Sequence, residues 1–175
     1  MTDRAGTAAA QWRRERPDID PFPMEVLGRL GEAAQVIGRD HLQPLFTAHG
    51  LQAGEFDVLA TLRRAGAPYA LTPTALYEVL MLSSGGMTSR IDRLEKASYI
   101  ARRKHPTDRR GTLVELTADG LALIEALLPV HVANERAVLA GLTAPEQRQL
   151  NALLAKLLAG LAGEGEPAAP GASRG

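Results

Sequence analysis

The segment from residue 72 to residue 116 constrains the fold most, because two short helices are followed directly by two short strands. Thr72 and Pro73 predict a helix start, since a hydroxyl at the N-cap precedes a proline at the first helical position. That helix should run over 73–80. Ser83 and Ser84 supply the next N-cap, for a helix of about four turns that ends near Ala97. Two short helices joined by a tight turn form a helix-turn-helix pattern.

The two strands enclose a polar, basic tip. Residues 99–104 and 112–116 read as strands, and the tip between them is HPTDRRG. The whole chain is neutral, with 20 Lys+Arg and 20 Asp+Glu, yet residues 83–116 hold eight basic and four acidic residues. A local positive excess on a neutral protein is expected of a polyanion contact, although an ordinary solvated surface would look similar.

Long helical segments flank this middle part. Residues 24–48 form an amphipathic run that Pro44 should kink or end, and residues 53–65 form a shorter helix closed by Gly66. After the hairpin, Thr117 caps a run to about residue 142, with a bend expected at Pro129. The sequence Thr143-Ala-Pro-Glu146 is a capping box that opens the last helix.

The last helix carries a leucine face that is too wide for a small core. Its members are Leu150, Leu153, Leu154, Leu157, Leu158 and Leu161. Packing within the chain is the plain explanation. The alternative is a homodimer surface that this helix forms together with the 24–48 helix, since terminal helices around a compact middle have little else to cover. The sequence favours dimerisation.

Both ends of the chain have few apolar residues that could be buried in a core. Residues 162–175 are rich in Gly, Pro and Ala and are expected to be disordered, as are the first few residues. Residues 8–16 can form a short helix that Pro17 stops. The predicted organisation is an N-terminal extension (1–23), dimerisation helices (24–48 and 117–161), a winged helix-turn-helix domain (51–116) and a disordered tail (162–175).

A helical wheel sorts the second helix of the pair. Met87, Ile91 and Leu94 cluster in one narrow sector and should face the core. The opposite side holds small polar residues near the helix start, including Ser89, flanked by Thr88. Such residues suit a helix that reads base edges in the major groove, and a basic hairpin tip suits the minor groove. The expected fold is therefore mainly α with a small β-hairpin wing.

These stretches resemble the winged-helix multiple-antibiotic-resistance regulators, the MarR family. The resemblance is carried by GEFDVLATLRRAG (54–66) and by LSSGGMTSRIDRLEKASYIARRKHPTDRRGTLVELTADG (82–120). It implies a homodimer that binds a pseudo-palindromic site in double-stranded DNA, with residues 83–93 as the reading helix and 104–110 as the wing. In such wings the residue matching Asp108 braces an arginine. The resemblance and the helical wheel together suggest these residues for DNA binding: Ser83, Ser84, Thr88, Ser89, Arg93, Lys104, Arg109 and Arg110.

The N-terminal extension is similar to that of the urate-responsive subgroup of this family. In that subgroup a Trp and an Arg of an added helix, an Asp of the following core helix and an Arg of the reading helix surround a purine ligand. The matching residues are Trp12, Arg16, Asp57 and Arg90. The resemblance implies a regulator, expected to be a repressor, whose DNA binding a small anion such as urate attenuates. Each residue also has a structural reading: Trp12 as core, Asp57 with Arg90 as an ion pair, and Arg16 as a solvated charge.

Other classes of protein fit less well. The chain has no Cys, and its four His residues lack metal-ligand spacing. LSSGG lacks the leading glycine of a G-x-S-x-G nucleophile motif. We therefore expect no enzyme, no metal and no cofactor. Since no apolar run or signal core is present, a soluble cytoplasmic protein without a membrane partner is expected. The remaining alternatives are a helical interaction module that does not bind DNA, and a regulator that answers to a non-purine organic anion.

Overall fold

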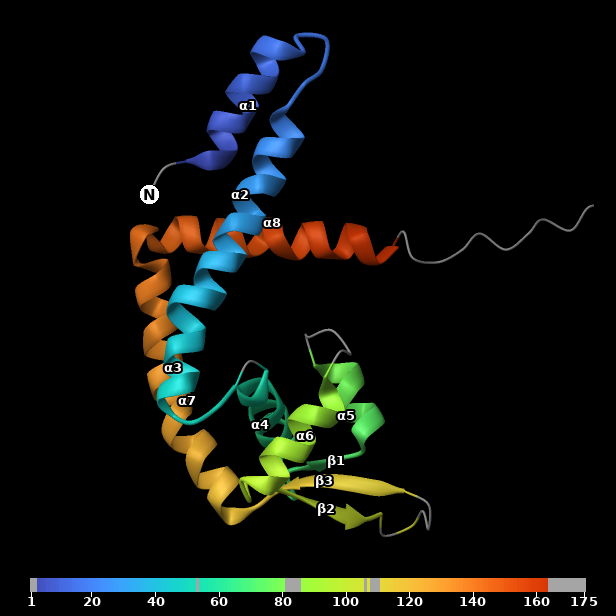
Figure 1. Cartoon of the computed structure of the whole chain (residues 1–175). Coiled ribbons are helices and arrows are strands. Elements are labelled where there is room, and N and C mark those ends of the chain that lie inside the picture. Colours follow the sequence, from blue (N-terminus) through green and yellow to red (C-terminus); the bar gives the residue numbers. More distant parts are fainter. Residues whose placement is uncertain (1–2, 53, 81–85, 106, 108–110, 164–175) are drawn as a thin grey trace, which may run out of the picture. The chain divides into compact units, whose positions relative to one another are not determined.

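The computed structural model describes residues 3–52, 54–80, 86–105, 107 and 111–163, and it forms two compact units, Met1–Asn134 and Glu135–Gly175. The fold is mainly helical with one small antiparallel sheet, as predicted (Figure 1). In chain order the elements are α1 (Arg4–Glu15), α2 (Phe22–Val36), η1 (Ile37–Leu42), α3 (Gln43–Ala48), α4 (Glu55–Arg64), β1 (Ala70–Leu71), α5 (Pro73–Val79), α6 (Met87–Lys96), β2 (Ile100–Lys104), β3 (Thr112–Leu116), α7 (Ala118–Val138), η2 (Leu139–Gly141) and α8 (Ala144–Gly163). Among the described helices, none is long and apolar enough to cross a membrane.

Helix α1 is longer than the sequence predicts and includes residues expected to be disordered. The Asp3 carboxylate caps it by accepting from the Gly6 N–H at 2.9 Å. The same carboxylate pairs with Arg29 on α2 at 2.5 Å. Figure 1 shows α1 running along the first part of α2. Contacts with a neighbouring helix therefore order a segment whose own composition offers little to bury.

The helical run over 22–48 continues through Pro44, where a kink or an end was expected. Proline lacks the N–H that an α-helix would bond to the carbonyl four residues back. The turn before it is π-helical, and the Gln43 N–H bonds to the Gly38 carbonyl five residues back. The wider turn accommodates the missing donor, so the chain stays helical as far as Ala48.

The core lies among α3 to α7 and the sheet. Its fully buried side chains are Leu59, Leu62, Leu76, Leu94, Ile100, Ile124, Leu127, Val58 and Val114. Thr72 caps α5 through a hydrogen bond from the Ala75 N–H at 3.1 Å, as its Thr-Pro sequence predicts. The core therefore fixes the orientation of α5 and α6, the two helices of the helix-turn-helix.

The sheet has three strands in the order β1-β3-β2, where the sequence predicted only the β2–β3 hairpin. Strands β2 and β3 confirm that prediction, with Ile100 opposite Leu116 and Lys104 opposite Thr112. The additional strand β1 has two residues and pairs Ala70 with Glu115. Two residues show no alternation in sequence, and the strand exists only because β3 offers it a free edge.

The described part of α6 begins later than predicted, with Gly86 rather than a serine as its N-cap. Gly86 has φ 88°, in the left-handed region that glycine adopts without a steric penalty. Ser83 and Ser84 lie outside the described residues, as do Asp108, Arg109 and Arg110 of the wing tip. The helix that the structure describes is accordingly about one turn shorter than expected at its start.

Helix α7 begins as predicted, with the Thr117 hydroxyl accepting from the Gly120 N–H at 3.0 Å. A side chain at Gly120 would place its Cβ 1.8 Å from the Tyr99 carbonyl oxygen, so only glycine fits where the helix leaves the sheet. In the second unit, Glu146 accepts from the Thr143 N–H at 2.7 Å and opens α8. Helix α8 reaches Gly163, two residues into the predicted disordered tail, and 164–175 lie outside the described residues.

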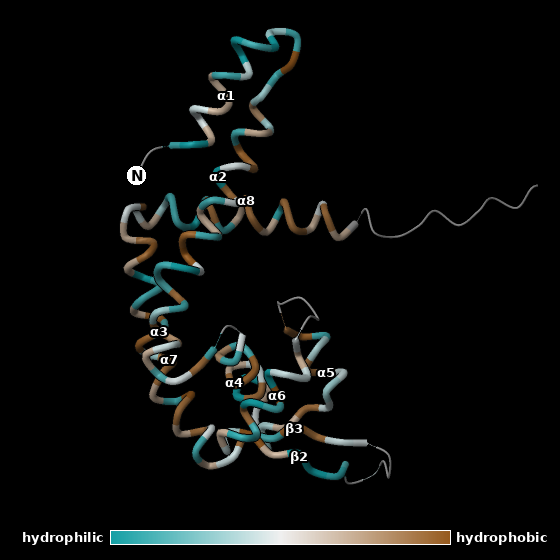
Figure 2. The backbone as a smooth tube through the Cα atoms, viewed as in Figure 1, coloured by the Kyte–Doolittle hydropathy of each residue, from teal (hydrophilic) through white to brown (hydrophobic). Residues whose placement is uncertain are grey.

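Apolar side chains remain exposed along α2 and α8. They include Phe22, Leu27, Leu153, Leu157, Leu158 and Leu161, and Leu158 is 65% exposed. Figure 2 shows apolar residues recurring along both helices. Each helix thus presents an apolar surface that the unit to which it belongs does not bury.

Candidate functional site

The core holds α6 by one side and leaves the other side exposed. Ile91 and Leu94 are buried, and Met87 packs against the same core, as the helical wheel predicts. Thr88 and Ser89 are exposed near the start of the helix. The face available to a binding partner is therefore the one that carries the small polar residues.

A buried carboxylate on α4 anchors Arg93. Glu55 is 4% exposed, and its Oε1 accepts from Arg93 Nε at 2.7 Å. Its Oε2 accepts from the Gln52 N–H at 2.6 Å. Sequence analysis placed Arg93 at DNA and did not single out Glu55, because nothing local marks a first-turn acid as buried. Arg93 is therefore hydrogen-bonded to a buried residue of α4. The role of Arg93 in DNA binding remains a prediction.

Two further arginines of the basic segment lie on β2 and pair with carboxylates of the same chain. Arg102 binds Asp92 at 2.5 Å and also binds Glu95, both on α6. Arg103 lies 3.4 Å from Glu115 on β3. Lys104, at the end of β2, is exposed. Part of the positive charge counted in the sequence is therefore paired with carboxylates of the same chain.

Asp57 on α4 and Arg90 on α6, two of the four predicted ligand residues, interact electrostatically. Burial raises the pKa of the Asp57 carboxyl above its ordinary value, and the nearby positive charges of His131, Arg90 and Arg64 partly offset that rise. Arg90 itself lies at the edge of the inward side, with its Nη1 atom buried. The structure brings these two residues into one electrostatic cluster, while their role toward a ligand is untested.

His131 belongs to this cluster although its place in the sequence gave no sign of it. Its ring, on α7, lies 4.3 Å from the Phe56 ring and 5.6 Å from the Phe46 ring. The two phenylalanine rings stack at 4.7 Å. The neighbouring helices α3 and α4 and the distant helix α7 thus contribute one ring each to an aromatic cluster. Among the described residues, no His, Asp and Glu cluster could hold a metal ion.

Trp12 and Arg16 lie on α1 and at its end. Trp12 is 44% exposed, and so is not a core residue of this chain. Arg16 donates from Nε and Nη2 to the Asp18 carboxylate at 2.7 and 2.6 Å, which closes the turn after α1. These hydrogen bonds direct Arg16 to its own segment and not to the cluster around Asp57.

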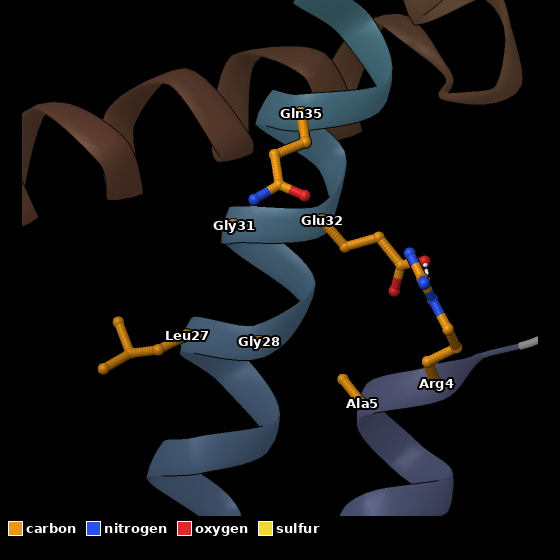
Figure 3. Close-up of a pocket in the computed structure, with 7 residues that line it drawn as sticks. All are labelled: Arg4, Ala5, Leu27, Gly28, Gly31, Glu32 and Gln35. Carbon is orange, nitrogen blue, oxygen red and sulfur yellow. Dashed lines mark hydrogen bonds and ion pairs between the residues drawn. The ribbon is translucent and has the colours of Figure 1, made fainter. Parts of the chain in front are cut away.

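A shallow cavity of about 440 Å³ lies between α1 and α2 (Figure 3). Its lining residues are Arg4, Ala5, Leu27, Gly28, Gly31, Glu32 and Gln35, so the four predicted ligand residues do not contribute to it. Figure 3 shows Arg4 and Glu32 paired across it, with Nε and Oε1 2.8 Å apart. The cavity is an opening between two helices joined by ion pairs.

Comparison with known proteins identifies the family. A family model described as the MarR family matches residues 49–111. The chain is 44% identical over 147 residues to the HTH-type transcriptional regulator PecS of Dickeya dadantii, covering 84% of this chain and 88% of that protein. It is 36% identical over 121 residues to the multiple antibiotic resistance protein MarR of Salmonella typhimurium, covering 68% of this chain and 78% of that protein.

Solved structures agree with these sequence matches. A mutant MarR from Escherichia coli complexed with operator DNA has a TM-score of 0.67 and 30% identity, covering 84% of this chain and 97% of that one. Sco3205, a MarR family regulator from Streptomyces coelicolor in complex with DNA, has a TM-score of 0.69 and 25% identity, covering 78% and 85%. These relatives are transcription regulators and not enzymes. The chain belongs to the MarR family of winged-helix transcriptional regulators.

Proposed function

We propose that this protein binds a pseudo-palindromic operator as a homodimer and represses transcription. The observation that carries the proposal is that α6 is buried on one side and exposed on the other. Ile91 and Leu94 fix one side of it in the core, Thr88 and Ser89 are exposed on the other side, and strand β2 of the hairpin packs against the helix. A helix held in this way can enter the major groove and a hairpin beside it can reach the adjacent groove. Two relatives of the same fold have been solved with DNA.

The residues divide into base readout and backbone contact. Ser89 and Arg93 would meet base edges or nearby phosphates, with Glu55 holding Arg93 in one orientation. The residues proposed to supply phosphate and groove contacts are Ser83, Ser84, Thr88, Lys104, Arg109 and Arg110. Phosphate contacts give affinity that falls with salt, whereas base contacts give preference among sequences.

The experiment is a binding assay on a duplex enriched by the wild-type protein from a random library. Affinity should fall steeply as salt rises, because each neutralised phosphate releases counterions. Arg110→Ala should weaken binding to all duplexes and flatten the salt dependence, while Ser89→Ala should change preference at a cost of about 1–3 kcal/mol for a lost base contact. If no duplex is enriched, the helical interaction module without DNA binding becomes the better reading.

The effector is proposed to be a small planar anion, with urate or a related purine as the first candidate. Arg90 lies on the reading helix and shares an electrostatic cluster with Asp57. An anion that took Asp57's place beside Arg90 would shift α6, and half-sites about 34–36 Å apart tolerate little shift. Trp12 would pack on the ring of the ligand. Arg16 would give up its hydrogen bonds to Asp18 and bind the ligand instead.

A thermal-shift titration with urate, xanthine and benzoate tests this assignment. A ligand that binds the native state raises the melting temperature further as its concentration rises above Kd. If the ligand lowers DNA affinity by some factor, DNA must lower the affinity for the ligand by the same factor. Arg90→Ala and Trp12→Ala should reduce both effects. A response to benzoate but not to the purines would favour the non-purine alternative and would leave the DNA-binding proposal intact.

A further inference from the structure

One arginine connects the wing to the reading helix. Arg102 lies on β2, which packs against α6. Its Nη2 donates to Asp92 Oδ1 at 2.5 Å, its Nη1 donates to Glu95, and its backbone N–H donates to Glu95 Oε1 at 3.1 Å. A single strand residue therefore binds two carboxylates that lie on successive turns of the helix.

We propose that Arg102 is a positioning residue for DNA recognition, which neutralises Asp92 and Glu95 and fixes the wing relative to α6 without binding DNA itself. This inference rests on the proposed DNA-binding function. It gives a specific role to one of the positive charges that the sequence would otherwise count toward phosphate contact.

Charge explains why the pairing matters. Asp92 is exposed on the side of α6 away from Ile91 and Leu94, so its carboxylate lies on the side that would approach DNA. A carboxylate there repels phosphate, and like charges brought together at an interface are strongly unfavourable. The planar guanidinium of Arg102 can satisfy both carboxylates at once, which a single-point cation cannot do equally well.

Geometry adds a second effect. The guanidinium pairs of Arg102 with Asp92 and Glu95, together with the hydrogen bond from its backbone N–H to Glu95, join the start of the wing to the last turns of α6, and Arg102→Ala removes the guanidinium pairs. The side chains involved are partly exposed, and exposed ion pairs contribute little to folding stability. Loss of Arg102 should therefore reduce DNA binding much more than it reduces stability, and that difference separates a positioning role from a purely structural one.

The test compares Arg102→Ala, Asp92→Asn/Glu95→Gln and the triple variant that combines them. Each is measured by fluorescence anisotropy on the enriched duplex at several salt concentrations, with thermal unfolding as a check of folding. Arg102→Ala should weaken binding by about tenfold or more, because Asp92 then faces the DNA without compensation and Glu95 loses its side-chain link to the wing. The triple variant should recover most of that loss, since it carries no carboxylate that needs Arg102.

The control is Arg63→Ala. Arg63 forms the same kind of pair, but with Glu125 of α7 and not with an acid of α6, so its loss should leave DNA affinity unchanged. A triple variant as weak as Arg102→Ala, with a salt slope smaller by about 0.9, would mean that Arg102 contacts a phosphate and would overturn the inference. Wild-type affinity in Arg102→Ala would overturn it as well. A wild-type protein that enriches no duplex would instead remove the proposed function, and this inference with it.

Discussion

At the scale of single residues, the four arginines of the basic segment that the structure describes interact with carboxylates of the same chain. Arg93 pairs with Glu55, Arg102 with two acids of α6, and Arg103 with Glu115, while Arg90 partly offsets the burial-raised pKa of the Asp57 carboxyl. The local excess of positive charge in the sequence therefore overstates the charge that α6 and β2 present to a polyanion. Position and pairing decide which cations can meet phosphate.

Because the pKa of the Asp57 carboxyl is raised, we expect an unusual pH dependence of folding stability. Burial raises its pKa in the folded protein, so the folded state holds the proton more tightly than the unfolded state does. Stability should then fall as the pH rises from the ordinary value of 3.8 through the raised pKa. Asp57→Asn removes the buried charge and should raise the melting temperature at neutral pH.

The gain from Asp57→Asn should vanish in acid, where Asp57 is protonated in both folded and unfolded protein. Melting curves of the two proteins from acid to neutral pH measure this, and Asp119→Asn at the surface start of α7 is the control, with no comparable change expected. A lower melting temperature for Asp57→Asn at neutral pH would show that the charges of His131, Arg90 and Arg64 outweigh the effect of burial.

The Glu55–Arg93 pair is expected to contribute to folding stability. Glu55→Ala removes both hydrogen bonds of a buried carboxylate and should lower the free energy of unfolding by roughly 1–3 kcal/mol, the usual range for bonds to a charged group. Glu55→Gln keeps the shape and one acceptor oxygen, so it should lose less. Urea unfolding measures both. Equal and negligible losses would show that Arg93 and Gln52 find other partners.

At the scale of elements, α1 is held to α2 mainly by polar contacts. Ion pairs join Arg4 to Glu32, Asp3 to Arg29 and Arg13 to Glu25, and Ala9 is the one residue of α1 that is buried. Exposed ion pairs contribute little each and weaken with salt. The docking of α1 should therefore depend on ionic strength and on the fit of its backbone against α2.

A pair of glycines on α2 allows that fit to be tested. A Cβ at Gly28 would lie 3.1 Å from the Ala5 Cβ, whereas a Cβ at Gly31 would meet nothing within 4 Å. Both substitutions to alanine should favour the helix by roughly 0.5–1 kcal/mol, but only Gly28→Ala should push α1 away. Hydrogen exchange of the α1 amides should increase in Gly28→Ala and stay unchanged in Gly31→Ala. Equal exchange in both would show that α1 adjusts without loss.

At the scale of the whole molecule, α2 and α8 each carry several exposed apolar side chains that a single chain leaves uncovered. Contiguous apolar surface on a soluble protein marks an interaction site. In the proposed homodimer a second copy covers it, and the two reading helices then stand at a fixed separation. DNA binding should consequently depend on α8, although no residue of α8 is proposed to contact DNA.

Deleting the chain from Thr143 onward should therefore abolish the dimer, leaving aggregated or monomeric protein that does not bind the enriched duplex. Leu158→Glu is a milder test of the same surface. Ala159→Glu is its control, because it introduces the same charge opposite the centre of the leucine face of the helix. Light scattering gives the mass of each. A monomer that binds DNA like the wild type would contradict the dimer proposal.

Sequence signals that act over a few residues predicted much of this protein correctly. Thr72 and Thr117 cap the helices that they precede, the β2–β3 strands fall where expected, and Ile91 and Leu94 face the core. Capping and periodicity are local, because a cap bonds within one turn and a wheel needs only one helix. The same locality made the family resemblance readable from residues 54–66 and 82–120.

Tertiary structure alone decided the rest. Strand β1 exists because β3 has a free edge, and the first turn of α1 is ordered because α2 lies beside it. Arg93 meets Glu55 across 38 positions of sequence, and His131 reaches Phe56 from another helix. Such contacts join residues that no local pattern links, since chain folding and not spacing brings them within reach. The sequence could therefore point to the helix that we propose reads DNA, but only the fold could show which of its charges are already paired.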